Sequence, residues 1–364
     1  MPIPLAASLS RRRAQTLRSL LEVPGPPLII GVAGDSSAGK TTYTNGLRRM
    51  LGDDIVGTIE MDGYHKEDRA TRARTGRSPL DPEMNHLGLL REHLEALRRG
   101  ESVHLRRYDH GTGTFIAPQP FSPKPILVLE GLHALYPEFT SLLDYTVFVD
   151  PARDIKLGWK IARDTQFRGH RVEPLADEIR KREAAFRRWI EFQKTDANVV
   201  IKIHRSKLKL LANEEYWGER PPEGCFHMEL IFQPAHTPLP PLRMSFSLAK
   251  MLGEDPLPFT LAVVPRSYWG RRANAIHLDG LMPPRAVHVL QGQIERFTGI
   301  EVTDAHLAGI RKHERMPAIV FTQLLVTWPI LEHIANLLEK RAAAAGVVPV
   351  ATVATAAETD DEFP

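Results

Sequence analysis

Short apolar runs alternate with helical patterns through the first part of the chain. Continuous apolar runs are typical of strands that are buried on both faces of a parallel sheet. The strands predicted from these runs cover residues 28–33, 56–61, 126–129, 145–149 and 198–203. The helices predicted from apolar periodicity cover residues 41–51, 87–99, 153–167 and 175–192. Strands that alternate with helices indicate a parallel α/β sheet, and the charged, turn-rich residues 68–80 predict a surface loop.

The pattern changes after residue 208. Prolines interrupt a region of shorter apolar runs, such as 228–232 and 259–264, which predicts a mixed, partly antiparallel extension. The ends of the chain differ again, because a Pro/Gly-rich segment precedes the first strand and an Ala/Val/Thr-rich segment with acidic residues closes the chain. We therefore expect an N-terminal arm, a core, a mixed α/β extension and a disordered tail, at residues 1–27, 28–208, 209–340 and 341–364.

The composition is that of an ordinary globular protein. Apolar residues make up 43% and charged residues 25% of the 364 residues, which excludes collagen-like and wholly disordered chains. A net charge of +3 gives no reason to expect a dedicated nucleic-acid binder. Cys225 is the only cysteine, so no disulfide can form within the chain, and we expect a reducing compartment, the cytoplasm.

Neither end of the chain predicts a membrane anchor. Residues 318–338 are the longest apolar candidate, but they contain Gln323, Pro329 and Glu332, so we expect a buried or interface helix and no membrane partner. Residues 11–13 are arginines without the apolar run of a signal peptide. A short basic amphipathic helix is the simpler interpretation, and a twin-arginine or transit signal is the alternative.

A glycine-rich loop follows the first predicted strand. Its residues fit the pattern G-x-x-x-x-G-K-[ST] at every fixed position: Gly34, Asp35, Ser36, Ser37, Ala38, Gly39, Lys40 and Thr41, with Thr42 next. Such loops surround phosphates with backbone N–H groups, while the lysine reaches the β- and γ-phosphates and the hydroxyl binds Mg²⁺. A chance match in a Gly/Ser turn is the alternative, but the strand before and the helix after are the context that the motif requires. We expect ATP, Mg²⁺ and a three-layer α/β fold of the P-loop NTPase type, with a mostly parallel central sheet.

Two carboxylates follow predicted strands, at the edge of the sheet where ligands bind. Glu130 stands where a metal-linked acid would lie, and Asp62 could accept a proton from a substrate hydroxyl. Each could instead cap the turn that follows it, although two such acids beside a phosphate loop favour a functional interpretation.

Polar residues gather in two further places. Lys160, Arg163, Asp164 and Arg168 have the spacing of one helix face, which could be a solvated surface or a cationic surface for phosphates. His65 and Arg69 follow Asp62, and Tyr108 and His110 lie near glycines. These loops could simply be polar, or they could bind a small anionic, hydroxylated substrate.

These residues resemble the phosphoribulokinase/uridine kinase family, and within it the phosphoribulokinases of cyanobacteria and plants. The resemblance is strong over residues 28–204. The segments that carry it are Asp62-Gly63-Tyr64-His65 with Arg69, Thr75-Gly76 with Leu80-Asp81-Pro82 and Asn85, Tyr108-Asp109-His110 with Thr112-Gly113, Glu130-Gly131-Leu132-His133, and Trp159-Lys160-Ile161 with Arg163-Asp164 and Arg168-Gly169-His170.

The resemblance implies transfer of the γ-phosphoryl group of ATP to the 1-hydroxyl of D-ribulose 5-phosphate, with a homodimer as the assembly. Asp62 matches the catalytic base, Glu130 the metal-linked acid and Asp164 a second essential carboxylate that also serves the metal. His65, Arg69, Lys160 and Arg168 match groups around the sugar phosphate, and we expect Tyr108 and His110 to bind the substrate as well. Arg163 and Arg182 match cations of a lid that acts with Lys40.

The chain also departs from the family's pattern. Ala38 stands where plant members have a redox-active cysteine, so a thiol switch within this chain is excluded. Gly63 replaces a second aspartate, and Glu183 replaces a lysine. The open alternatives are another acceptor, such as a nucleoside or a different sugar phosphate, and a non-catalytic nucleotide-binding regulator. Nucleic-acid binding is weakly supported, because phosphate ligands explain clustered arginines equally well.

Overall fold

The computed structural model describes residues 15–166, 175–211, 225–234, 242, 244, 258–307, 310 and 316–347. The side chains of residues 162–181, 209 and 211 lie outside that description. The arginines at 11–13 and the predicted tail from residue 348 onward also lie outside it.

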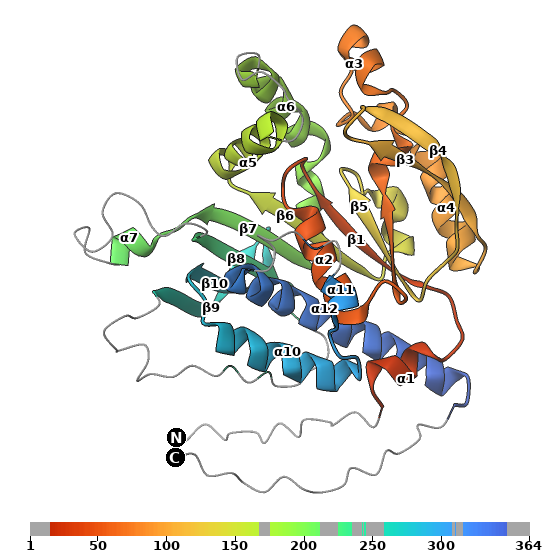
Figure 1. Cartoon of the computed structure of the whole chain (residues 1–364), viewed down its shortest axis with the longest axis vertical. Helices are drawn as coiled ribbons and strands as arrows, with labels where there is room; N and C mark the ends of the chain where they lie inside the picture. Colours follow the sequence, from red (N-terminus) through yellow and green to blue (C-terminus); the bar gives the residue numbers. More distant parts are fainter. Residues whose placement is uncertain are drawn as a thin grey trace, which may run out of the picture.

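One eight-stranded sheet organises the described chain, in the order β2-β5-β1-β6-β7-β8-β10-β9 (Figure 1). Its strands are β1 (Leu28–Gly34), β2 (Val56–Glu60), β5 (Ile126–Gly131), β6 (Tyr145–Pro151), β7 (Val199–Arg205), β8 (Phe226–Phe232), β9 (Phe259–Tyr268) and β10 (Arg271–Gly280). The strands from β2 to β7 pair in parallel, whereas β8, β10 and β9 continue the sheet antiparallel. The mostly parallel α/β fold predicted from the apolar runs is confirmed, and the C-terminal extension belongs to the same sheet.

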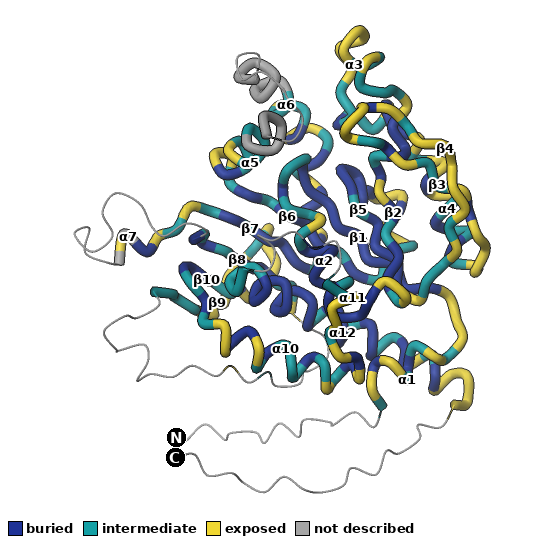
Figure 2. The backbone as a smooth tube through the Cα atoms, in the orientation of Figure 1, coloured by how far each residue is buried: buried dark blue, intermediate teal, exposed yellow. Residues whose placement is uncertain are grey.

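Helices cover both faces of this sheet. One face packs against α1 (Leu17–Leu21), α2 (Lys40–Leu51), α10 (Pro284–Thr298) and α12 (Pro317–Ala344). The other face packs against α4 (Leu87–Arg98) and the end of α6 (Leu175–Trp189). Figure 2 shows β1 in dark blue along its length, and it is buried at every position because it is covered from both sides. The remaining helices are α3 (Arg69–Thr75), α5 (Arg153–Gln166), α7 (Leu208–Leu211) and α11 (Asp304–Leu307).

The predicted surface loop at 68–80 is wrong in part, because it contains α3. Asp68 caps this helix by accepting a hydrogen bond from the Thr71 N–H at 2.7 Å, and Gly76 ends it with a left-handed backbone (φ 68°). No residue of α3 is buried, so the segment has none of the apolar periodicity from which a helix is predicted.

A separate two-stranded sheet was also missed. It consists of β3 (Val103–Asp109) and β4 (Thr114–Phe121), paired antiparallel with an irregularity between Leu105 and Arg107. β4 has no buried residue and contains two prolines, which is why its sequence does not alternate like a strand. Tyr108 therefore lies on a strand rather than in a loop.

The apolar segment near the C-terminus forms α12, which continues to Ala344, so the predicted tail at 341–364 begins too early. This helix has the length and hydropathy of a membrane span, yet 78% of its most apolar 18-residue window is buried inside the protein. Such burial is typical of a core helix. α12 packs along α2, where the Gln323 Nε2 donates to the carbonyl of Thr42 at 2.7 Å. The C-terminal extension thereby supports the helix that follows the phosphate loop.

Candidate functional site

The loop between β1 and α2 has the backbone that a phosphate-binding loop needs. Gly34 (φ 152°) and Gly39 (φ 93°) adopt conformations that L side chains rarely adopt, and a Cβ on Gly34 would lie 2.5 Å from the carbonyl oxygen of Val149. Ser37 also has a positive φ, of 63°. The Lys40 Nζ donates to the carbonyl of Asp35 at 2.9 Å, which holds the ammonium group across its own loop. The predicted order of strand, loop and helix is confirmed.

Glu130 ends β5 beside this loop. Its Oε1 accepts a hydrogen bond from the Thr41 hydroxyl at 2.6 Å, and its Oε2 accepts one from the Thr44 hydroxyl at 2.9 Å. Burial raises the pKa of Glu130, and the nearby Lys40 ammonium opposes that shift. The two residues predicted to serve Mg²⁺ from this side therefore lie in contact.

These oxygen donors fit a magnesium ion. Mg²⁺ prefers hard oxygen ligands and commonly uses one or two protein groups together with substrate phosphates and water. Thr41 and Glu130 supply such oxygens beside the loop. Among the described residues, no group of three or more His, Cys, Asp or Glu side chains could hold a metal ion by itself. Thr41 and Glu130 would therefore hold Mg²⁺ together with a nucleotide, and Asp164, the third predicted metal residue, lies outside the described side chains.

Asp62 lies in η1 (Met61–Tyr64), the short 3₁₀ helix that follows β2. The Nε2 of His65 lies 3.4 Å from its Oδ1, and the Nε2 of His110 lies 3.2 Å from its Oδ2. Burial would raise the pKa of Asp62, but the hydrogen bonds from His110 and His65 outweigh it and hold that pKa well below its usual range. Asp62 is thus an ionised carboxylate that keeps 33% of its side chain exposed.

The protonation of His65 follows from its second partner. Its Nδ1 lies 2.7 Å from the Oδ1 of Asn85, whose Nδ2 donates to the carbonyls of Pro79 and Asp81. That orientation makes the Asn85 Oδ1 an acceptor, so the Nδ1 of His65 carries a proton. The ring is thereby held between Asn85 on one side and Asp62 on the other.

The other predicted substrate residues before β5 gather around the same histidines. The Tyr108 ring packs edge-on against His65 and His110, with ring centroids 5.9 Å and 5.2 Å apart. The Arg69 guanidinium donates to the carbonyl of His110 at 2.5 Å and so holds the β3–β4 turn. Arg72, which the sequence analysis missed, donates to the Tyr108 hydroxyl at 2.8 Å. The structure therefore brings together Asp62, His65, Arg69, Tyr108 and His110.

Asp35 makes a different kind of contact from the rest of the loop. It is 3% exposed and receives the Arg182 Nη2 at 2.6 Å and the Lys156 Nζ at 3.0 Å. Burial opposes ionisation, but Arg182 and Lys156 hold the pKa of Asp35 below its usual range. Arg182, which was expected to be a lid cation near the substrate, is thus engaged with the phosphate loop. Lys156 on α5 and Arg182 on α6 thus join both helices to that loop. The role of Lys156 was not predicted from the sequence.

The remaining predicted cations are less fully described. Lys160 lies on α5 and is partly buried. The side chains of Arg163, Asp164 and Arg168 lie outside the described residues, so their roles stay predictions. α5 itself lies near the loop, since a Cβ on Gly39 would come within 3.9 Å of the Trp159 ring.

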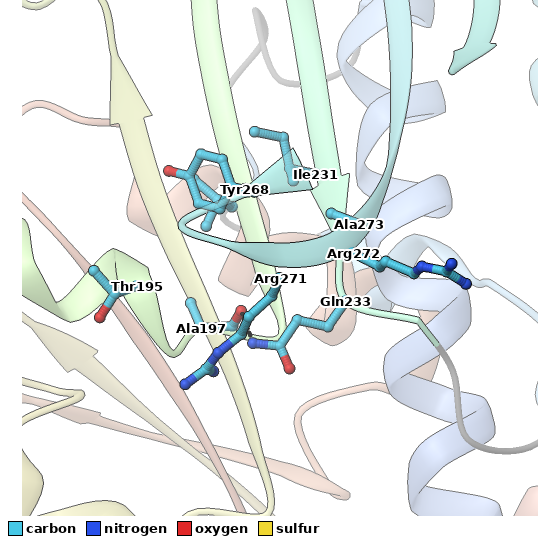
Figure 3. A pocket seen from close by; sticks show the side chains of 9 residues that line it. Thr195, Ala197, Ile231, Gln233, Tyr268, Arg271, Arg272 and Ala273 are labelled. Atoms are coloured by element: carbon cyan, nitrogen blue, oxygen red, sulfur yellow. Dashed lines mark hydrogen bonds between the residues drawn. The ribbon is translucent and has the colours of Figure 1, made fainter. Parts of the chain in front are cut away.

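Two hollows lie away from Asp62. One has a volume of about 180 Å³ and is lined by side chains of both signs, among them Lys156, Glu183 and Lys202. The other measures about 10 Å³, no more than one water, and Figure 3 shows Tyr268, Gln233 and Ile231 around it. Neither includes the phosphate loop.

Comparisons with known proteins point to one family. A sequence profile described as the phosphoribulokinase / uridine kinase family matches residues 29–208. Uridine kinase from Aliivibrio salmonicida is 32% identical over 183 residues, which cover 48% of this chain and 85% of that protein. This chain belongs to the phosphoribulokinase/uridine kinase family.

Within the family, the chain is also similar to longer members. Phosphoribulokinase from Synechocystis sp. is 38% identical over 182 residues, which cover 50% of this chain and 55% of that protein. The match thus spans about half the length of that curated relative. The solved structure of phosphoribulokinase from Rhodobacter spheroides matches with a TM-score of 0.50 and 22% identity, over 75% of this chain and 98% of that chain. That likeness supports the fold, C-terminal extension included.

Proposed function

We propose that this protein is an ATP-dependent kinase that phosphorylates the 1-hydroxyl of D-ribulose 5-phosphate, giving ribulose 1,5-bisphosphate. The observation that carries the proposal is the ionised Asp62 between His65 and His110, in η1 directly after β2, the strand that pairs with the Glu130 strand β5. Glu130 in turn bonds Thr41 of the phosphate loop. The proposed base for the acceptor hydroxyl and the proposed site for the donor phosphates would therefore lie at adjacent strand ends.

Asp62 would take the proton from the attacking hydroxyl. A carboxylate with a depressed pKa is a weak base in the ground state, but the low pKa ensures that it is ionised at neutral pH. The two histidines fix its orientation. Lys40 would stabilise the charge on the β- and γ-phosphates, with Arg163 as the proposed lid cation. Mg²⁺, when bound, neutralises phosphate charge, and Thr41 with Glu130 would hold it.

The acceptor is the part of the proposal that family membership leaves open. Relatives named phosphoribulokinase and relatives named uridine kinase both match. The predicted substrate residues Arg69, Lys160 and Arg168 favour an acceptor that already has a phosphate, because a neutral nucleoside gains little from charged donors. Another sugar phosphate remains an alternative. A non-catalytic regulator is a weaker one, since Lys40, Thr41, Asp62 and Glu130 are all present.

We further propose that the enzyme works without a thiol switch, in a reducing compartment such as the cytoplasm. Cys225 is buried, and burial raises its pKa to about 11, so the thiol is protonated and unreactive at neutral pH. The resemblance suggests a homodimer, which light scattering of the purified protein would test.

The test is ATP turnover with Mg²⁺ and ribulose 5-phosphate, uridine or no acceptor, run beside Asp62→Asn. We expect turnover that needs ribulose 5-phosphate and falls by about 10²-fold or more in the variant, the scale of losing a general base. Turnover with uridine alone would move the proposal to the alternative acceptor. ADP formation no faster than the blank in every lane would contradict a kinase function.

A further inference from the structure

The turn that carries Asp62 is held by an arginine from a different part of the chain. The Arg106 Nε donates to the carbonyl of Gly63 at 2.9 Å, and its Nη2 donates to the carbonyl of His65 at 2.5 Å. These two carbonyls lie on either side of Tyr64, directly after Asp62. One planar guanidinium therefore spans η1 and the residue that ends it, as its fixed fork of donors allows.

The strand β3 is shaped to place this side chain. Arg106 lies at the irregularity in the pairing of β3 with β4, between Leu105 and Arg107. Such irregularities often lie beside active sites, where they redirect a side chain. The guanidinium also stacks on the Phe115 ring of β4, with its Cζ 3.7 Å from the ring centroid. Arg106 is thus fixed on one side by β4 while it bonds η1 on the other.

The backbone of β3 also contacts η1 directly at Gly63. A Cβ on Gly63 would lie 1.9 Å from the carbonyl oxygen of Arg106, a distance at which the backbone must move. Only glycine allows this approach. Gly63 stands where the family's pattern has a second aspartate. In this chain the backbone of β3 occupies the space that a side chain at this position would need.

The rest of η1 is held by its neighbours on the other side. The His86 N–H donates to the carbonyl of Tyr64 at 2.8 Å, and His65 pairs with Asn85. Arg106 thus completes the support of a turn that belongs to neither sheet. Asp62 and His65, which must keep their mutual distance of 3.4 Å, are both carried by that turn.

We propose that Arg106 is a positioning residue, which together with the glycine at 63 sets the place of Asp62 and His65 relative to the acceptor. It acts through the backbone of η1 and touches neither substrate nor nucleotide. The proposal rests on the proposed kinase function, and it predicts a defect in turnover rather than in nucleotide binding, because the phosphate loop is a separate segment.

The experiment compares Arg106→Met with Arg107→Met, its exposed neighbour on β3, and with Arg106→Lys. For Arg106→Met we expect kcat to fall by about 10- to 100-fold, the scale of a displacement of about 1 Å in a reacting group. The KM for ATP should change less than about 3-fold. Arg106→Lys should recover part of kcat because an ammonium can still reach one carbonyl. Arg107→Met should stay within about 2-fold of the parent protein, as is usual for exposed sites.

Two readouts separate positioning from folding. Loosening His65 from Asp62 lets the pKa of Asp62 rise towards its ordinary value, so the acid limb of kcat/KM should move to higher pH in Arg106→Met. Gly63→Ala keeps Arg106 but forces η1 away from β3, and it should reproduce the fall in kcat. Hydrogen exchange of peptides covering 61–65 should be faster in both variants than in Arg107→Met.

The proposal is overturned if Arg106→Met turns over as fast as Arg107→Met, or if its acid limb does not move. It is equally overturned if hydrogen exchange at 61–65 is unchanged, since the hydrogen bonds from Arg106 to η1 would then not exist in solution. Failure of the kinase function looks different: the parent protein itself would phosphorylate no acceptor, while the exchange comparison would still report the contact.

Discussion

The buried carboxylate of Asp35 provides a quantitative test of how the lid helices are attached to the phosphate loop. Asp35→Asn removes the charge that holds Arg182 and Lys156 and keeps the size of the side chain. Removing one partner of a buried ion pair costs about 3–5 kcal/mol. Arg182 and Lys156 keep 20% and 14% of their side chains exposed and can turn partly towards water, so the lower end of that range applies. We expect a loss of about 3 kcal/mol in the free energy of unfolding.

A matched control is present in the same chain. Asp53 accepts two hydrogen bonds from the Arg48 guanidinium, at 2.6 Å and 2.7 Å, but 60% of its side chain is exposed. Asp53→Asn breaks the same kind of pair in a solvated place and should cost less than about 1 kcal/mol. Urea unfolding followed by tryptophan fluorescence compares the two variants. Equal stabilities within about 0.5 kcal/mol would refute the assignment of Asp35 as a buried anchor.

The stability difference between the parent protein and Asp35→Asn should also depend on pH in a defined direction. The folded-state pKa of Asp35 is depressed, so its stabilising contribution is present above the unfolded-state value of about 3.9 and is lost as the pH falls towards the folded-state pKa. The difference between the parent protein and Asp35→Asn should be constant from about pH 6 to 8 and shrink below about pH 4. A difference that grows on acidification would have the wrong sign.

Three further outcomes follow from other contacts. Glu130→Gln should raise the KM for Mg²⁺ and lower kcat by about 10²-fold. Magnesium titration at saturating ATP measures both effects. An unchanged magnesium dependence would show that Glu130 does not serve the metal site. Burial raises the pKa of Glu130, whereas the pKa of Asp62 is depressed. Acid should therefore protonate Glu130 and weaken magnesium binding before it protonates Asp62. As the pH falls, the KM for Mg²⁺ should rise first, and kcat at saturating Mg²⁺ should fall only at lower pH. Gln323→Met leaves the partly buried Thr42 carbonyl without its 2.7 Å donor and should lower the free energy of unfolding in urea by about 1 kcal/mol. No loss would mean that α12 supports α2 through apolar packing alone.

The sequence predicted the parts of the fold that depend on local pattern. β1, β5 and β6 are continuous apolar runs because both faces are covered, and the order of strand, loop and helix around Lys40 follows from the motif. α3 and the pair β3–β4 were missed because their residues are mostly exposed, so neither has an apolar period to detect. What positions them is capping, turns and contacts with η1.

The candidate site shows the same division. Asp62, Glu130 and Thr41 could be found because they follow strands or occupy fixed positions in a motif. Arg106 and Lys156 could not, because each acts on a segment far away in the sequence and no spacing rule links them to it. The prediction for Arg182 was incomplete for the same reason, since its partner Asp35 lies 147 residues away.

Product identity tests the central claim most directly. ATP, Mg²⁺ and ribulose 5-phosphate are incubated with the purified protein and followed by ³¹P NMR. The account predicts that ADP and a sugar with two phosphomonoester signals form in equal amounts, and that Asp62→Asn suppresses both together. A single new phosphate signal from free phosphate, or no loss of ribulose 5-phosphate while ATP is consumed, would contradict it.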